Sequence, residues 1–396
     1  MTAGRLALAF AAALPAMAAD TILVLPFFNL SEQETASRID WVGESISEAI
    51  REALAAEGLL VLGREEREEA YRRLSVRPGA RLTTATVIKI AQTLDAARVF
   101  YGTFDVHMDS ADTPLTEANL RIRSQLLNLR EMEPGEDLEE LGALADLPSI
   151  ERQLAWRALR RVGRAPSEEE YAARHPLRRL DALESYVRGL LAPADDQKLR
   201  LFAQAARLDE SYSQANFALG RLYARQEEWR HAVQWLRKVD PGNSRYSEAQ
   251  FLLGLSLYYT ADFPGAAGAF AEVAGKVPLN EVFNNLGAAQ SRSNQPEAAA
   301  NFRRALEGDE TDPDYHFNLG YALWKHGQFS EAADAFRAVL AREEDDADAT
   351  LMLGRCLKQS GPRQGDPRSD GLERLKHTYE EGAYRQLKAE LESGPK

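Results

Sequence analysis

Cysteine is nearly absent from this sequence, which has a single one, Cys356, among 396 residues. One thiol cannot form an internal disulfide, a cysteine-type zinc site or an iron–sulfur cluster. The six histidines are scattered, and none lies in the H-E-x-x-H spacing of a zinc enzyme. The sequence has no G-x-S-x-G turn, and no glycine-rich phosphate loop follows its first apolar run. We therefore expect no catalytic residue, no metal and no cofactor, and a protein that is not an enzyme.

Positive charge is also in deficit, with 48 Lys and Arg against 61 Asp and Glu, a formal net charge of −13. A general nucleic-acid binder needs a basic footprint, so we expect no nucleic-acid partner. After the first twenty residues, no stretch approaches the roughly 18 apolar residues of a membrane-spanning helix. We therefore expect the mature chain to have no stable membrane anchor.

The first residues have the composition of an export signal. Arg5 gives a basic start, residues 6–14 are apolar, and Ala16-Met17-Ala18 forms an A-x-A cleavage site. The pattern predicts a signal peptide over 1–19, cleaved near Ala18, and hence a periplasmic or secreted protein. A cytoplasmic protein with an alanine-rich start is the alternative.

Residues 20–165 mix strand and helix periods. Ile39, Val42, Ile46, Ile50 and Leu54 form the apolar stripe of an amphipathic helix that ends at Gly58. The other patterns predict strands over 22–28, 59–62, 97–106 and 119–129, and helices over 64–74, from 84, and over 137–163. This order predicts a small α/β domain with a mixed sheet covered by helices, followed by a linker over 166–180.

The start of this domain resembles a known family. Val24-Leu25-Pro26-Phe27, Asn29, Ser31, Trp41, Gly43 and Gly102 are similar to marks of the TolB amino-terminal-type domain, over about 22–130. That domain occurs in bacterial envelope proteins and ahead of tetratricopeptide arrays. The resemblance implies a non-catalytic α/β module, with no known ligand.

The second part of the chain is repetitive. A leucine followed by a glycine recurs five times, at spacings of 34, 33, 33 and 34. The glycines are Gly220, Gly254, Gly287, Gly320 and Gly354. An alanine and an apolar or aromatic residue recur about 12 to 16 positions after each of the first four glycines. This is the tetratricopeptide (TPR) period of paired helices. It predicts an α-solenoid over 181–391, with a degenerate first repeat over 183–215 and a charged C-terminal capping helix from 371. The whole chain is thus an α+β multidomain protein.

The solenoid's concave face is the predicted binding site. With Leu-Gly at places seven and eight of each repeat, places 6, 9 and 13 share one stripe of the first helix. From this stripe and Trp324 beside it we predict a peptide-binding groove made by Arg221, Arg225, Tyr259, Asn285, Arg292, Asn318, Tyr321, Trp324, Lys325 and Arg355. The basic residues favour a partner segment that carries carboxylates.

Asn285 and Asn318 occupy the same place in adjacent repeats. A side-chain amide offers a donor and an acceptor, which suits a peptide unit. An asparagine at this place resembles the one found in TPR domains that clamp a C-terminal carboxylate. The lysines of those domains are not all present here. The alternative is that both asparagines bond within the solenoid.

These patterns favour an exported scaffold or adaptor that binds protein or peptide partners in the bacterial cell envelope. An assembling subunit of an envelope export or assembly machine is the alternative, and the sequence leaves the oligomeric state open. A hydrolase with appended repeats is the third interpretation, which the scattered histidines disfavour.

Overall fold

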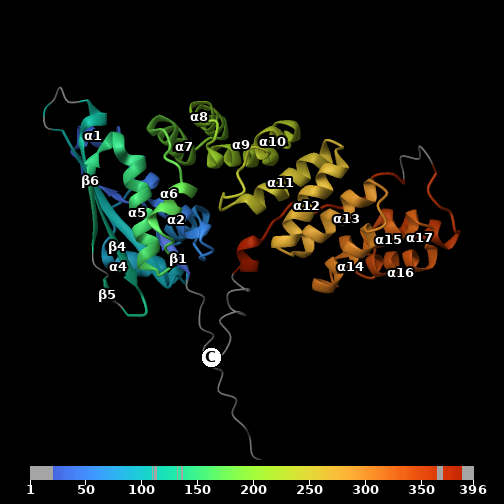
Figure 1. Cartoon of the computed structure of the whole chain (residues 1–396). Helices are drawn as coiled ribbons and strands as arrows, with labels where there is room; N and C mark the ends of the chain where they lie inside the picture. The colour runs from blue at the N-terminus through green and yellow to red at the C-terminus, as the bar shows by residue number, and fades with distance from the viewer. Residues whose placement is uncertain are drawn as a thin grey trace, which may run out of the picture.

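The computed structural model describes residues 21–108, 110, 114–131, 133–134, 137–363 and 369–385. The expected signal peptide lies outside these residues. Figure 1 shows a small domain of strands and helices, from which a curved row of paired helices extends. The predicted fold class, an α/β mixed-sheet domain followed by an α-solenoid, is confirmed.

The sheet is mixed because its strands arrive in both directions. Its strands are β1 (Ile22–Val24), β2 (Phe28–Asn29), β3 (Arg98–His107), β4 (Asn119–Asn128), β5 (Glu133–Pro134) and β6 (Leu138–Ala143). Strands β1 and β2 run parallel to β3, whereas β4 is antiparallel to β3, and β5 and β6 are antiparallel to β4. The strand expected over 59–62 is reduced to one bridge between Ile22 and Val61.

Helices cover both faces of the sheet. Neighbouring residues of β3 point to opposite faces, so Phe100 packs in one apolar cluster and Val99 in another. The first cluster lies under α2 (Val42–Ala56) and α5 (Leu147–Arg161), and the second under α3 (Arg64–Arg73) and α4 (Thr84–Thr93). The short helix α1 (Gln33–Ala36) precedes α2.

The helix predicted over 137–163 is wrong at its start. Residues 138–143 form β6, and the helix α5 begins only at Leu147. The open edge of β4 explains the difference, because it offers backbone partners to this segment. Glu139 also lies 3.7 Å from Arg121 and 3.2 Å from Arg123 on β4, and opposite charges across strands favour pairing.

The interval 166–180, expected as a linker, contains a packed helix, α6 (Glu168–Arg174). Ser167 and Glu170 close a capping box at its start. Tyr171 is 3% exposed and stacks on His175, with ring centroids 4.1 Å apart. Arg174 lies 2.9 Å from Glu57 at the end of α2, so this segment is part of the α/β domain's surface.

The solenoid consists of helix pairs. The pairs are α7 (Leu180–Leu191) with α8 (Asp195–Leu208), α9 (Ser213–Arg225) with α10 (Trp229–Leu236), α11 (Tyr246–Tyr259) with α12 (Phe263–Lys276), α13 (Asn280–Arg292) with α14 (Ala298–Gly308) and α15 (Pro313–Lys325) with α16 (Phe329–Leu340), before α17 (Ala347–Leu357). The repeated glycine lets the two helices of a pair approach. A Cβ atom on Gly254 would lie 2.7 Å from the Phe270 ring, and one on Gly189 of the degenerate repeat 2.5 Å from Phe202.

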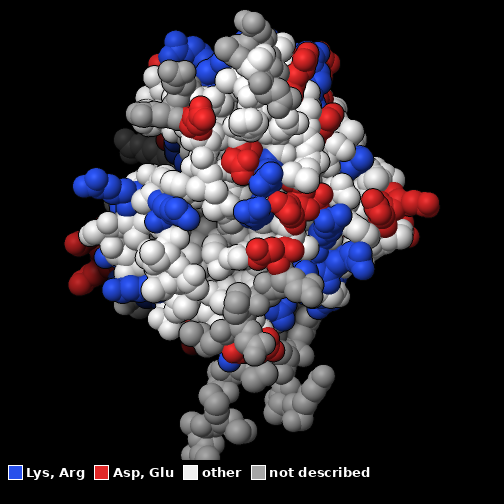
Figure 2. Space-filling model, turned by 90° about the vertical axis from the view of Figure 1, so that its left-hand side faces the viewer, with Lys and Arg blue, Asp and Glu red and all other residues white. Residues whose placement is uncertain are grey.

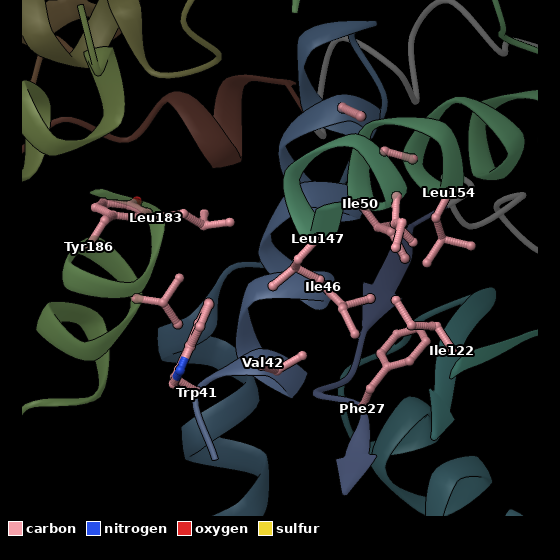
Figure 3. Packing of buried hydrophobic residues seen from close by; sticks show 14 of the residues in the cluster. Phe27, Trp41, Val42, Ile46, Ile50, Ile122, Leu147, Leu154, Leu183 and Tyr186 are labelled. Carbon is pink, nitrogen blue, oxygen red and sulfur yellow. The ribbon is translucent and has the colours of Figure 1, made fainter. Parts of the chain in front are cut away.

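The domain and the solenoid share one apolar cluster. Trp41, just before α2, lies beside Leu183 and Tyr186 of α7 (Figure 3). All three side chains are less than a tenth exposed. Arg188 of α7 also donates a 2.8 Å hydrogen bond to the carbonyl oxygen of Arg38. The two parts therefore form one packed body rather than two units on a flexible junction.

Candidate functional site

The concave face of the solenoid is occupied by the chain's own C-terminal segment, residues 369–385, which we call the tail. Residues 372–380 have no helical structure, and within the tail the helical residues begin only at 381. The prediction of a capping helix from 371 is therefore wrong over this stretch. In Figure 1 the red end of the chain lies next to α11, far from the last repeat.

Two buried asparagines hold the tail's backbone. Asn318 donates from Nδ2 to the carbonyl oxygen of Arg374 at 2.7 Å, and its Oδ1 accepts the Arg374 N–H at 2.8 Å. Asn285 pairs in the same way with Lys376, at 2.8 Å in both directions. Both asparagine side chains are fully buried. Each amide thus satisfies both backbone groups of one residue of an extended chain.

These bonds explain why the tail is extended. Alternate residues of an extended strand present their backbone groups on the same edge, about 7 Å apart. Arg374 and Lys376 are such alternate residues, and Asn318 and Asn285 stand on adjacent repeats. Helix propensity differs by only about 0.7 kcal/mol per residue among ordinary side chains, so these tertiary contacts override it.

A third asparagine, Asn284, joins the pair. It donates to the carbonyl oxygen of Arg374 at 2.8 Å and accepts a 2.7 Å hydrogen bond from Asn318. This residue is not among those predicted from the sequence. The sequence does mark Asn284 as unusual, because other repeats have a phenylalanine at the same place, namely Phe217, Phe251 and Phe317.

One acidic side chain of the tail enters the groove. Glu373 accepts a 2.8 Å hydrogen bond from the Ser291 hydroxyl and lies 3.7 Å from the Lys325 ammonium group. Its side chain is fully buried, and its Oε2 has no hydrogen-bond partner among the described residues. Burial lowers the pKa of Lys325, and nearby Glu373 opposes that effect. The groove therefore offers a carboxylate a buried, incompletely satisfied position.

Two basic side chains of the tail meet acids of the solenoid. Arg374 lies 2.7 Å from Asp346 and 3.4 Å from Asp314. Lys376 lies 2.8 Å from Asp312 and 2.7 Å from Asp314. Burial opposes the charge of Lys376, but hydrogen bonds to these two carboxylates outweigh it and raise its pKa. The segment in the groove thus carries both signs of charge, whereas the basic residues of the sequence predict a segment with carboxylates.

Apolar and aromatic contacts complete the fit. Leu372 packs against the cluster of α15 and α17, and Leu375 against that of α11 and α13. Tyr379 stacks on Phe251, with ring centroids 4.9 Å apart. Tyr259 shares a 2.7 Å hydrogen bond with the ring of His377.

Six of the ten predicted groove residues contact the tail. Besides the residues already described, Arg292 donates to Asp370 at 2.9 Å and Tyr321 donates to the carbonyl oxygen of Ser369 at 2.7 Å. The six are Tyr259, Asn285, Arg292, Asn318, Tyr321 and Lys325. That they bind a separate partner remains a prediction.

The other four predicted residues have other neighbours. Arg221 lies 3.8 Å from Glu65 of the α/β domain, and Arg225 lies 2.6 Å from Asp195 of α8. Trp324 donates to the carbonyl oxygen of Ser360 at 2.7 Å, and Arg355 lies over its ring at 5.8 Å. The side chains of Arg221 and Arg225 therefore belong to the domain junction and to the first repeats rather than to the filled groove.

A second hollow, with a volume of about 1130 Å³, lies between the α/β domain and the first repeats. Burial raises the pKa of Glu151 to about 8, and burial together with Glu48 raises that of Glu52 to about 7. Tyr384 and Arg385 at the end of the tail line the same hollow. The tail thus extends from the groove to the domain junction.

In the part of the chain that the structure describes, no three His, Cys, Asp or Glu side chains are placed to hold a metal ion. Among the same residues, no helix combines the length and apolar character needed to cross a membrane. On the face that Figure 2 shows, the described positive and negative side chains are interleaved.

Comparisons with known proteins agree with the helix pairs. The family model "Tetratricopeptide repeat" matches residues 317–361, and the model "TPR repeat" matches residues 291–327. Residues 291–361 are therefore similar to TPR repeats, in agreement with the helix pairs of the fold. No curated protein matches the sequence.

Several solved structures are similar to parts of this chain. YrrB, described as a TPR protein with an unusual peptide-binding site, has 20% identity and a TM-score of 0.35, covering 49% of this chain and 92% of that one. MamA from Desulfovibrio magneticus has 21% identity and a TM-score of 0.36, covering 40% and 92%. PilF from Pseudomonas aeruginosa has 20% identity and a TM-score of 0.36, covering 45% and 83%.

Proposed function

We propose that this chain is an exported, non-enzymatic scaffold whose groove binds an extended segment of a protein partner. One observation carries the proposal. Asn285 and Asn318 each bond both backbone groups of one residue of the tail, as a neighbouring strand would. Such bonds recognise an extended backbone of any sequence, while the surrounding side chains supply specificity.

The asparagines hold residues inside the tail rather than a chain terminus. Arg374 and Lys376 lie well before the last residue, Lys396. We therefore expect the groove to take an internal segment of a partner and to need no terminal carboxylate.

The cellular setting is part of the same proposal. Arg5, the apolar run over 6–14 and Ala16-Met17-Ala18 support export to the periplasm or medium. The resemblance of residues 22–130 to the TolB amino-terminal-type domain supports a role in a bacterial cell envelope. N-terminal sequencing of the exported protein should begin at Ala19 or Asp20, and an intact Met1 on the cell's entire pool would contradict export.

Photo-crosslinking in the producing cells tests the groove. A benzophenone side chain replaces Tyr259, which is 42% exposed beside the tail. The control places it at Arg303, exposed on the outer helix α14. We expect a discrete protein adduct from the groove position only, mapped to an extended segment of the partner. Equal adducts from both positions, or self-adducts alone, would contradict the proposed function.

A further inference from the structure

We propose that the tail is a tethered competitor, and that the partner must displace it with an extended segment of the same chemical pattern. In this pattern an apolar residue is followed by an acid, a base, an apolar residue and a base, as in Leu372 to Lys376. The inference rests on the proposed function and adds the partner's chemistry and its regulation.

The groove reads each position of this pattern differently. The acid position faces Ser291 and Lys325. The first base faces Asp346 and Asp314, and the second faces Asp312 and Asp314. Exchanging the acid with the following base would put like charges together at both positions, which is strongly unfavourable when they are partly buried. The register of charge, rather than net charge, therefore selects the partner.

The tail is held weakly enough to leave. Of residues 369–380, only Ser369 and Glu373 are buried, and Asp370, His377 and Glu380 are exposed. Each partly exposed ion pair contributes little to the stability of the bound tail, because water screens the two charges. The buried Oε2 of Glu373, without a hydrogen-bond partner among the described residues, costs binding energy that a better-fitting segment would not lose.

The tether gives the tail its advantage. A segment joined covalently to the protein that binds it competes at an effective concentration that can reach millimolar order. A partner segment can bind only the fraction of grooves that the tail leaves empty. Its apparent affinity is therefore its intrinsic affinity multiplied by that fraction. We expect the tail to weaken binding of a free segment by about 10- to 100-fold.

The test uses a synthetic peptide of residues 369–380, SDGLERLKHTYE, as the probe. Its affinity is measured by fluorescence anisotropy for the full mature chain and for two tail-released variants. One is the full chain with Arg374→Glu/Lys376→Glu, which places acids opposite Asp312, Asp314 and Asp346. The other ends at Arg363. Two variants are used so that a folding failure in one leaves the other, with helicity and melting checked by circular dichroism.

Matched controls separate charge from release. Arg303→Glu/Arg337→Glu makes the same change of charge at exposed positions on the outer helices α14 and α16. A second peptide has the acid and the first base exchanged, SDGLRELKHTYE, at constant composition. We expect both released variants to bind the first peptide about 10- to 100-fold more tightly than the unaltered chain and the charge control. The exchanged peptide should bind at least about tenfold more weakly.

Three results would overturn the inference, and each removes a different part of it. Equal affinity of the released variants and the unaltered chain would show that the tail does not compete, while groove binding itself would stand. Equal binding of both peptides would show that the order of charges along the segment does not select the partner. Absence of binding to every folded variant would overturn the proposed function as well.

Discussion

The two ends of the solenoid's inner surface use the same repeat positions for different purposes. On α9, Arg221 and Arg225 lie near acids of the α/β domain and of α8. On α13 and α15, Arg292 and Lys325 at the place of Arg225, and Tyr321 at the place of Arg221, contact the tail instead. A place in a repeat therefore fixes where a side chain points, while the neighbouring segment decides what it does.

The ends also differ in the kind of contact. The first end is joined to the α/β domain through buried apolar side chains such as Trp41, Leu183 and Tyr186. The far end holds the tail through backbone hydrogen bonds and partly exposed ion pairs. Apolar burial of this kind is lost only when the body unfolds, whereas polar contacts can be exchanged for those of another segment.

The largest expected effect is at the apolar end. Trp41→Ala removes a side chain that is 2% exposed between α2 and α7. We expect a loss of about 3–5 kcal/mol in the free energy of unfolding, measured in urea. Because the two parts share a cluster, the unaltered chain should unfold in a single transition. Separate transitions of the two parts would contradict the shared core.

The buried acid at the junction gives a pH dependence. The native pKa of Glu151 is about 8, above its usual 4.5, because burial disfavours the charged form. Between these values the native state binds more protons than the unfolded state, so stability falls as pH rises. We expect Glu151→Gln to be near neutral at pH 5 and stabilising by about 1–3 kcal/mol at pH 8. Equal effects of the substitution at both pH values would contradict the raised pKa.

The asparagine pair should control access to the tail. Asn285→Ala/Asn318→Ala removes the four bonds to Arg374 and Lys376, which are themselves sites of trypsin cleavage. We expect cleavage at these two residues to become about tenfold faster or more, equivalent to about 1.4 kcal/mol. The control is Asn301→Ala, an asparagine that bonds Gln290 away from the tail. Unchanged cleavage of the pair variant would contradict the role of the amides.

The smallest effect is expected in the first repeats of the solenoid. Arg225→Ala breaks an exposed ion pair with Asp195. Such pairs contribute about 0.2–1 kcal/mol, so stability should change by no more than that. The affinity for the peptide should not change either, because Arg225 pairs with Asp195 rather than with the tail. A tenfold loss of peptide affinity would extend the functional groove to the first repeat.

Much of this fold follows from the sequence. The recurring glycine marks close helix pairs. A Cβ atom on Gly220, Gly254 or Gly287 would lie less than 3.0 Å from Leu236, Phe270 or Phe302 of the paired helix. The alternating strands β3 and β4 were likewise predicted from their period. The predictions that were wrong concern β6 and the tail, which both have helical sequence patterns. Both are held extended by partners far away in the sequence: β4 pairs with β6, and Asn318 and Asn285 bind the tail.

The site was predicted only in part for the same reason. Asn285 and Asn318 were chosen because an amide matches a peptide unit, and that chemistry is what the structure shows. The ligand was not predictable, because nothing in the repeat period says that residues 372–380 return along the groove. Arg221 and Arg225 were assigned to the groove because the repeat period does not show that Arg221 lies beside the α/β domain and Arg225 beside α8.

Amide hydrogen exchange of the tail tests the central claim most directly. In the unaltered chain, the N–H groups of Arg374 and Lys376 should exchange slowly, because Asn318 and Asn285 accept them in a buried site. In Asn285→Ala/Asn318→Ala they should exchange near the rate of an unfolded peptide, while the solenoid helices keep their protection. Rapid exchange of both groups in the unaltered chain would show that the tail does not occupy the groove.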